Sequence, residues 1–268
     1  MKKISILGAG WLGTPLALHF KELGHQIKVS TTKLNKLHDF QKQGLQAFLI
    51  DTDQEEQTDD WELFFKDTDL LIITIPPAHN QVLKTNYSEK IRKIIPNIEK
   101  HKIKEVIFTS STTVYISLSG LVDEKTEVFP VSEMDKQILE VENLLLKNPY
   151  FQSAILRLGG LIGEDRHPVH YIVKKSVVND ANNPVNMVHR KDIIRFLSKM
   201  VTKVLPNDVF NIVAPIHHNR RDFYTQEAKK LGLSPLPHFI DNPSADFRKV
   251  NGEKITKFSE LNYRYLID

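Results

Sequence analysis

Three glycines close to the N-terminus have a spacing that suits phosphate binding. Gly8, Gly10 and Gly13 form the pattern G-x-G-x-x-G, and Trp11 and Leu12 separate the last two. The pattern directly follows a β-branched run and opens a helix-length segment, as its mechanism requires. The first glycine allows a tight turn, the second lets the backbone approach a pyrophosphate, and the third lets the helix pack closely. We therefore expect these five residues to bind a dinucleotide, the alternative being a purely structural turn.

Residues at the ends of the next strands predict the remainder of a cofactor site. NAD sites usually carry a carboxylate about 20 residues after the loop, whereas Thr31 and Lys33 stand here and no acid accompanies them. Hydroxyls and an ammonium suit a 2′-phosphate, so we expect NADP as the cofactor, with NAD as the alternative. Asp51 either accepts a hydrogen bond from the adenine amino group or caps the following turn. Pro76 ends the fourth strand, where backbone would line the cofactor cleft.

The elements that must position these residues alternate along the chain. Most of the predicted strands are continuous apolar runs, which is typical of strands covered on both faces in a parallel sheet. Helix-length segments separate them, which favours a doubly wound α/β fold. The predicted strands are 4–7, 26–31, 47–50, 70–75, 105–110, 153–158 and 210–213, and the predicted helices are 15–23, 85–100, 133–146, 193–201 and 220–231. We expect residues 1–158 to form the dinucleotide-binding domain and residues 159–268 a smaller substrate lobe packed on it.

Composition narrows the classes of function. The chain has 268 residues, a net charge of +3 and 26% charged residues, and its basic residues form no run that suits nucleic acid. It has no cysteine, which excludes disulfides, thiolate metal sites and a cysteine nucleophile. Adjacent His217 and His218 point apart, so we expect no metal site. No apolar stretch approaches ~20 residues, so we expect a cytoplasmic protein without a membrane span.

The segment after the fifth predicted strand resembles a known superfamily. Residues 108–115 read Phe-Thr-Ser-Ser-Thr-Thr-Val-Tyr. This resembles the Ser/Thr-rich strand end followed by Val-Tyr in the extended short-chain dehydrogenase/reductases, the NAD-dependent epimerase/dehydratase family. Residues 157–163 and 186–192 resemble later segments of that family, so the resemblance covers nearly the whole chain. It implies a Rossmann fold, an NAD(P) cofactor, and a monomer or homodimer.

The resemblance also implies a set of catalytic residues, with one departure. The family uses a Ser or Thr, a Tyr, and a Lys four residues after the Tyr. Ser111 takes the Ser position, and Lys136 takes the ribose-binding Lys position because members often carry an acid four residues later, here Glu140. Counting back from Lys136 places Ser132 where the Tyr should be. An aliphatic hydroxyl does not ionise usefully near neutral pH, so Tyr115 is the phenol that remains as a candidate.

Two functions follow from this departure. The first is an NADP-dependent oxidoreductase or epimerase that acts on a carbonyl compound or a sugar nucleotide. The second is a non-catalytic NADP-binding sensor. Arg166 and His167 either meet an anionic substrate or belong to a surface loop. Asp192 is expected to cap the helix that follows it.

Overall fold

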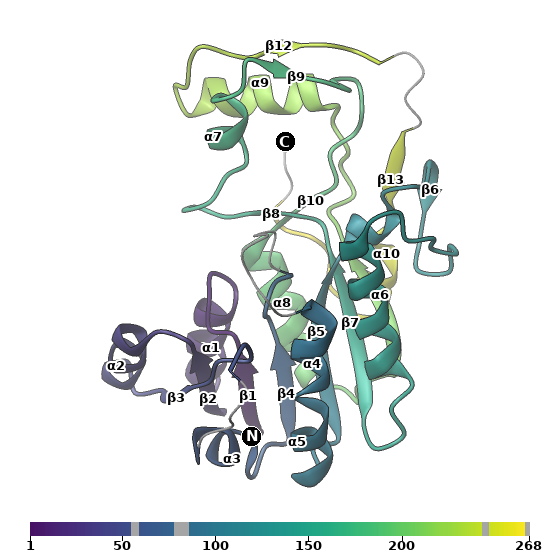
Figure 1. The fold of residues 1–268 in the computed structure, drawn as a ribbon. Coiled ribbons are helices and arrows are strands. Elements are labelled where there is room, and N and C mark those ends of the chain that lie inside the picture. Colours follow the sequence, from purple (N-terminus) through teal and green to yellow (C-terminus); the bar gives the residue numbers. More distant parts are fainter. Residues whose placement is uncertain (55–58, 78–85, 243–246, 266–268) are drawn as a thin grey trace. The chain divides into compact units, whose positions relative to one another are not determined.

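A seven-stranded sheet forms the centre of the computed structural model, which describes residues 1–54, 59–77, 86–242 and 247–265 (Figure 1). Its strand order is β11-β7-β5-β4-β1-β2-β3. β1 pairs in parallel with β2 and β4, β2 with β3, and β4 with β5. The strands are β1 (Lys3–Leu7), β2 (Gln26–Thr31), β3 (Gln46–Leu49), β4 (Leu70–Ile73), β5 (Glu105–Ser111), β7 (Gln152–Leu158) and β11 (Asp208–Ile212). The strands after β1 are added first on one side of it (β2, β3) and then on the other (β4, β5), which makes this the switch point of a doubly wound sheet. The predicted fold is confirmed.

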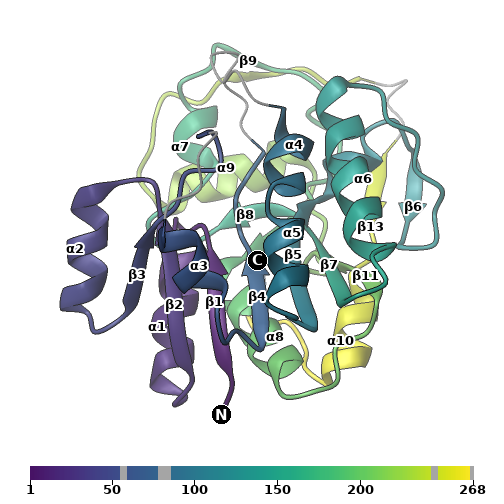
Figure 2. The same cartoon turned by 60° about the horizontal axis from the view of Figure 1, so that its bottom comes forward.

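Helices alternate with the strands along the chain. They are α1 (Gly13–Glu22), α2 (Leu34–Lys42), α3 (Asp59–Phe65), α4 (Tyr87–Arg92), α5 (Ile95–Lys100), α6 (Glu133–Leu146), α7 (Val169–Ile172), α8 (Arg190–Val201), α9 (Arg220–Lys230) and α10 (Glu253–Ser259). In Figure 2, α3, α4, α5 and α6 lie along one face of the sheet. All four residues of β4 are buried, because apolar side chains from both faces pack around it.

Several predicted boundaries differ from the structure for local reasons. The predicted helix 85–100 divides into α4 and α5, because Pro96 lies in the first turn of α5 and cannot continue a helix from α4. Its first residue, Thr85, lies outside the described residues. The predicted strand 70–75 ends at Ile73, three residues before Pro76. Helices α2 and α3 were not predicted. Both are short, and residues 55–58 before α3 are not described.

The described chain divides into two compact units, each discontinuous in sequence. The first contains residues 1–111, 130–156 and 200–209, and the second contains residues 112–129, 157–199 and 210–268. The predicted boundary at 158 lies close to one of these crossings, but residues 112–129 join the second unit and residues 200–209 join the first. No helix in the described ranges has the length and apolar character needed to cross a bilayer.

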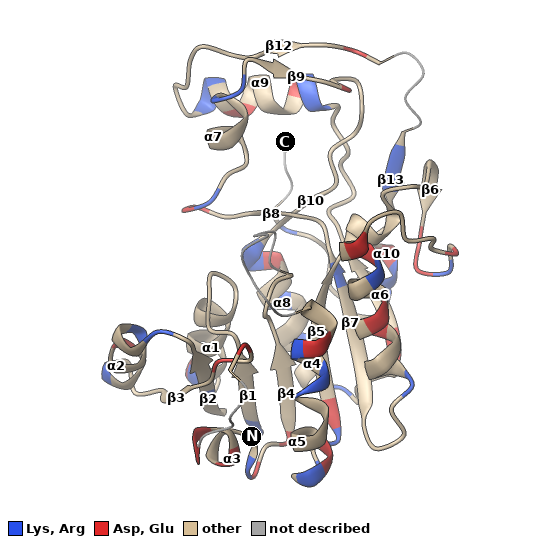
Figure 3. Ribbon diagram, viewed as in Figure 1, with Lys and Arg blue, Asp and Glu red and all other residues tan. Residues whose placement is uncertain are grey.

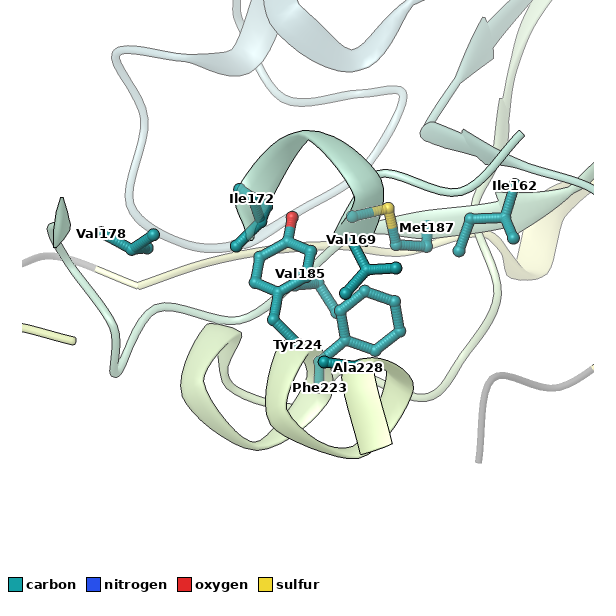
Figure 4. Close-up of a cluster of buried hydrophobic side chains, with 9 residues drawn as sticks. All are labelled: Ile162, Val169, Ile172, Val178, Val185, Met187, Phe223, Tyr224 and Ala228. Atoms are coloured by element: carbon teal, nitrogen blue, oxygen red, sulfur yellow. The ribbon is translucent and has the colours of Figure 1, made fainter. Parts of the chain in front are cut away.

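The second unit has an apolar core of its own. Figure 4 shows side chains of α7 and α9 that face one another, with Met187 and Val185 beside them. Short parallel strand pairs complete this unit: β8 (Gly160–Ile162) with β10 (Met187–His189), β9 (Val177–Val178) with β12 (His238–Phe239), and β6 (Gly120–Val122) with β13 (Arg248–Val250).

Candidate functional site

The loop after β1 is held by the end of β2. Gly8 has a φ of 101°, a left-handed conformation that side chains rarely adopt. Its N–H donates to the Ser30 hydroxyl at 2.9 Å, and the Ala9 N–H donates to the Ser30 carbonyl at 2.9 Å. The Gly10 N–H then folds back to the Gly8 carbonyl at 2.7 Å. These bonds fix the turn before α1 begins.

The other two glycines meet different surroundings. A Cβ atom on Gly13 would lie 2.5 Å from the Gly8 carbonyl oxygen and 2.9 Å from Thr74 Oγ1, so only glycine lets α1 pack here. A Cβ atom on Gly10 would meet no atom nearer than 4.0 Å, so the space beside it is open. Leu12 caps α1 without a side-chain hydrogen bond, and no acidic residue lies in the first turn. This combination leaves backbone N–H groups and the positive helix end for an anion such as a pyrophosphate.

The end of β2 carries the residues expected at the ribose. Thr31 is buried, and its hydroxyl accepts the Lys33 N–H at 3.1 Å. Lys33 is exposed at the start of α2, which has no side-chain cap. The exposed lysine is therefore the group of this strand end that a cofactor phosphate can reach, while Thr31 shapes the turn.

Asp51 and Pro76 lie after β3 and β4. The Asp51 carboxylate accepts the Asp53 N–H at 3.0 Å, which is the turn-capping alternative, and a contact with adenine stays a prediction. Pro76 is exposed, and the neighbouring Ile75 carbonyl accepts the Tyr87 hydroxyl at 2.9 Å.

A buried polar pair lies at the end of β5. The Ser110 hydroxyl donates to the Glu142 carboxylate of α6 at 2.5 Å, and Glu142 is 2% exposed. Burial, with the charge of Glu142, raises the pKa of Tyr87 far above its usual range. Sequence reasoning missed this pair. Glu142 stands four residues after Ile138 on the apolar face of α6, and an acid in that stripe is the signal that marks it.

The start of α6 is arranged differently from the expected catalytic helix. Ser132 is the N-cap: its hydroxyl accepts the Asp135 N–H at 3.1 Å, and the Asp135 carboxylate accepts the Ser132 N–H at 3.1 Å. Lys136 is exposed, and its Nζ lies 3.4 Å from the Glu133 carboxylate. Glu140 accepts from Arg92 and does not meet β5. The acid of α6 that contacts β5 is therefore Glu142 rather than Glu140.

Tyr115 lies in the interior of the second unit. Its side chain is fully buried, and its hydroxyl accepts from Arg157 Nη1 at 2.7 Å. The same hydroxyl lies 3.0 Å from Asn211 Oδ1 and 3.1 Å from the Asp123 carbonyl. Burial raises the pKa of Tyr115, although the Arg157 charge opposes this. Such contacts are typical of a structural tyrosine, and its proton-donor role stays a prediction.

Replacing Tyr115 by Phe separates these two roles. We expect Tyr115→Phe to lower the free energy of unfolding by ~1–3 kcal/mol, because Arg157 and Asn211 lose a buried partner. Urea denaturation measures this, with Tyr265→Phe, at an exposed tyrosine, as the control that should change little. An unchanged stability together with lost turnover would instead assign Tyr115 to proton transfer.

A basic cavity of about 470 Å³ lies in the second unit around α7. Arg166, His170 and Lys174 line it, together with Tyr171, and none of the described residues that line it is acidic. His167 also lines it, and its Nδ1 accepts the Val169 N–H while its Nε2 lies 3.3 Å from Glu227. Burial lowers the pKa of His167 despite this carboxylate. The cavity therefore suits an anionic group.

The predicted role of Asp192 as a helix cap was wrong. It was expected to cap a helix that begins at residue 193, but α8 begins at Arg190, and Asp192 lies in its first turn. Its fully buried carboxylate accepts the backbone N–H groups of Arg264 and Tyr265, each at 3.0 Å, and pairs with Arg195 at 2.6 Å. The Asp192 carboxylate therefore holds residues 264 and 265 in place through their backbone N–H groups.

The predicted site residues are thus distributed over both units. Gly8, Gly10, Trp11, Leu12 and Gly13 form one loop, and Thr31, Asp51 and Pro76 follow the strands beside it. Ser111 ends β5 and Lys136 lies on α6, both in the first unit, whereas Tyr115 belongs to the second. The structure adds the contacts of Ser30 with the glycine loop and the buried pair of Ser110 and Glu142.

Comparisons with known proteins place the fold and the family. No protein-family model matches the chain. The structure resembles UDP-glucuronic acid 4-epimerase from Bacillus cereus, solved in complex with NAD, with a TM-score of 0.81, 19% identity and coverage of 99% of this chain and 93% of that one. It also resembles ADP-L-glycero-D-manno-heptose-6-epimerase from Helicobacter pylori, with a TM-score of 0.79, 17% identity and coverage of 99% and 92%. Protein YeeZ of Escherichia coli strain K12 is 33% identical over 267 residues, which span 99% of this chain and 97% of that protein. The chain has the fold of the epimerases and belongs to the family of Protein YeeZ.

Proposed function

We propose that this protein binds a nicotinamide dinucleotide, preferably NADP, and acts as an oxidoreductase or epimerase on a carbonyl compound or a sugar nucleotide. The observation that carries the proposal is the glycine loop. Gly13 is packed too closely for any side chain, while the space beside Gly10 is open. The close packing at Gly13 brings the start of α1 against the loop, and the open side of Gly10 leaves room for a pyrophosphate to approach the backbone. The fold shared with an epimerase solved in complex with NAD supports the same conclusion.

Each part of the chain has a role in this proposal. The glycine loop and the start of α1 bind the pyrophosphate, and Lys33 binds the 2′-phosphate. A bound nicotinamide would supply or accept the hydride. Ser111 orients the reacting oxygen of the substrate, and Lys136 contacts the ribose.

Lys33 gives a direct test of cofactor preference. We expect Lys33→Ala to weaken NADPH binding about three- to tenfold, because an exposed charge contributes modestly to a phosphate contact. The affinity for NADH should stay unchanged, since NADH has no 2′-phosphate. Isothermal titration calorimetry measures both, and Lys42→Ala, at the far end of the same helix, is the charge-matched control. Equal losses for the two nucleotides would contradict the NADP preference.

The experiment that tests the whole proposal begins with binding. Saturating NADPH should raise the melting temperature, because a ligand that binds only the folded state stabilises it. Purified protein with NADPH is then incubated with a panel of aldehydes, ketones and nucleotide sugars, and oxidation is followed at the absorbance of the reduced nicotinamide. Epimerase activity, which consumes no net cofactor, is followed by separation of the sugar products. If no nucleotide shifts the melting temperature, the proposal fails.

The arrangement of α6 favours a second candidate, a non-catalytic sensor of NADP. If Glu142 is the acid that follows the family's Lys by four residues, Ile138 takes the Lys position and Met134 the Tyr position. Ile138 is 1% exposed, so in this alignment an apolar core residue occupies the position of the catalytic Lys. If the protein is a sensor, we expect it to bind NADPH without turnover of any substrate. We also expect a protein partner whose affinity for this protein changes when NADP is bound. Turnover that survives Ser111→Ala and Lys136→Ala would exclude both predicted catalytic roles.

A further inference from the structure

A strip of polar residues crosses the first three strands at their amino ends. In the register of the sheet, Ser5 lies beside Lys28 and Lys28 beside Gln46, while Lys3 lies beside Gln26. Neighbouring residues in register point to the same face. Parallel sheets are normally apolar on both faces because helices cover them. This strip departs from that pattern beside the end of α3, where the Ser5 hydroxyl donates to the Phe64 carbonyl at 3.0 Å.

The end of α3 borders this strip and leaves part of it exposed to a cavity. The helix ends at Phe65, and the chain turns through Lys66 and Asp67, where Asp67 has a left-handed φ of 54°. Between the strip and this turn lies a cavity of about 370 Å³, which we call the amino-end groove. The groove is lined by Lys3, Ile4, Ser5, Gln26, Lys28, Gln46, Phe48, Leu63, Lys66, Asp67 and Thr68. It adjoins the amino end of β1, whereas the glycine loop follows the carboxyl end of that strand.

The groove carries an excess of positive charge. Lys3, Lys28 and Lys66 line it, and Asp67 is the single acidic residue among the described residues of its wall. Two of the acidic residues of α3, red in Figure 3, have partners outside the groove wall or on its edge. Asp60 accepts the Leu49 N–H at 2.7 Å, and Glu62 pairs with Lys100 at 2.6 Å.

Lys28 is held in a fixed position within this wall. Its ammonium donates to the Leu63 carbonyl at 2.7 Å and to the Lys66 carbonyl at 2.5 Å, which uses two of its three donors. It also lies 6.0 Å from the centre of the half-buried Phe48 ring. Burial lowers the pKa of Lys28, and the charges of Lys3 and Lys66 act in the same direction. The groove is thus lined by the positioned ammonium of Lys28, by the Phe48 ring and by two further lysines.

We infer that the amino-end groove is a second ligand site, which binds a small phosphate monoester that carries a flat ring. Lysines recognise a phosphate as point charges, and three lysines stand against one carboxylate among the residues that line the groove. The Phe48 ring gives a face for a flat ring, and the amides of Gln26 and Gln46 offer further hydrogen bonds. The volume suits a ligand of metabolite size. The site is independent of the dinucleotide site, so either can exist without the other.

Three probe compounds separate the contribution of the phosphate charge to binding from that of the flat ring. Phenyl phosphate carries both, inorganic phosphate only the charge, and phenol only the ring. Calorimetric titrations are done with saturating NADPH present, so that the glycine loop is not available to the probes. We expect phenyl phosphate to bind about three- to tenfold more tightly than inorganic phosphate, and phenol not to bind measurably. Equal affinity for the two phosphates would overturn the inference, because it would indicate general attraction by lysines.

Matched variants then locate the binding. Lys66→Gln should weaken phenyl phosphate binding about five- to tenfold, whereas Lys36→Gln, an exposed lysine of α2 outside the groove, should leave it unchanged. Phe48→Leu should remove the advantage of phenyl phosphate over inorganic phosphate. Melting temperatures confirm that the variants are folded. Equal effects of Lys66→Gln and Lys36→Gln, or binding that Phe48→Leu does not alter, would overturn the site.

Discussion

Gly10→Ala is expected to weaken dinucleotide binding about 5- to 150-fold while the protein stays as stable as the parent. The new Cβ atom meets no protein atom nearer than 4.0 Å, and the residue has no left-handed φ, so the free protein accepts the change. It occupies the open space in which the proposed pyrophosphate lies, and such overpacking costs ~1–3 kcal/mol. Calorimetric titration with NADPH measures the loss, and urea denaturation measures the stability.

Gly13→Ala is the matched control, since the chemical change is the same three residues later. Its Cβ atom would lie 2.5 Å from a backbone oxygen, so we expect the free energy of unfolding to fall by ~1–3 kcal/mol before any ligand is added. If both variants bind NADPH as the parent does, the loop is a structural turn. If Gly10→Ala is as unstable as Gly13→Ala, the open space beside Gly10 is not present in solution.

Asp192→Ala is expected to lower the free energy of unfolding by ~3 kcal/mol. The buried carboxylate accepts from the backbone of Arg264 and Tyr265 and pairs with Arg195, so its loss leaves three donors without their acceptor. Asp192→Asn keeps one acceptor oxygen and should cost about half as much. Urea denaturation measures both, and hydrogen exchange at residues 264 and 265 should accelerate in Asp192→Ala. A change below ~0.5 kcal/mol in both variants would show that the C-terminal segment is not held by Asp192.

The central sheet is readable from the sequence because its signals are local. The β2 boundaries agree with the prediction, and β1 differs by one residue, since both strands are rich in β-branched residues. The bounds of α6 also agree, because Ser132 and Asp135 form a capping box that belongs to the helix start itself. The part of the fold without such signals, α3 and the short strand pairs of the second unit, was not predicted.

The candidate site was predictable only in part. The glycines were identified because the turn that they form depends only on the backbone conformation of six consecutive residues. Ser30 was overlooked, although its hydroxyl and its carbonyl hold the loop, because its role depends on the register between β1 and β2. The role of Asp192 depends on residues more than seventy positions away, which no local pattern reports.

The sequence by itself determined the glycine loop and the alternation of strands and helices, since both arise from short-range geometry. Only the tertiary structure decided which acid of α6 faces β5. Glu140 and Glu142 are two residues apart, which is about 200° around a helix, so one meets Arg92 and the other Ser110. It also decided that the Tyr115 hydroxyl meets Asn211, which lies 96 residues away. Orientation about a helix axis and long-range contacts depend on packing, and packing is a property of the folded chain.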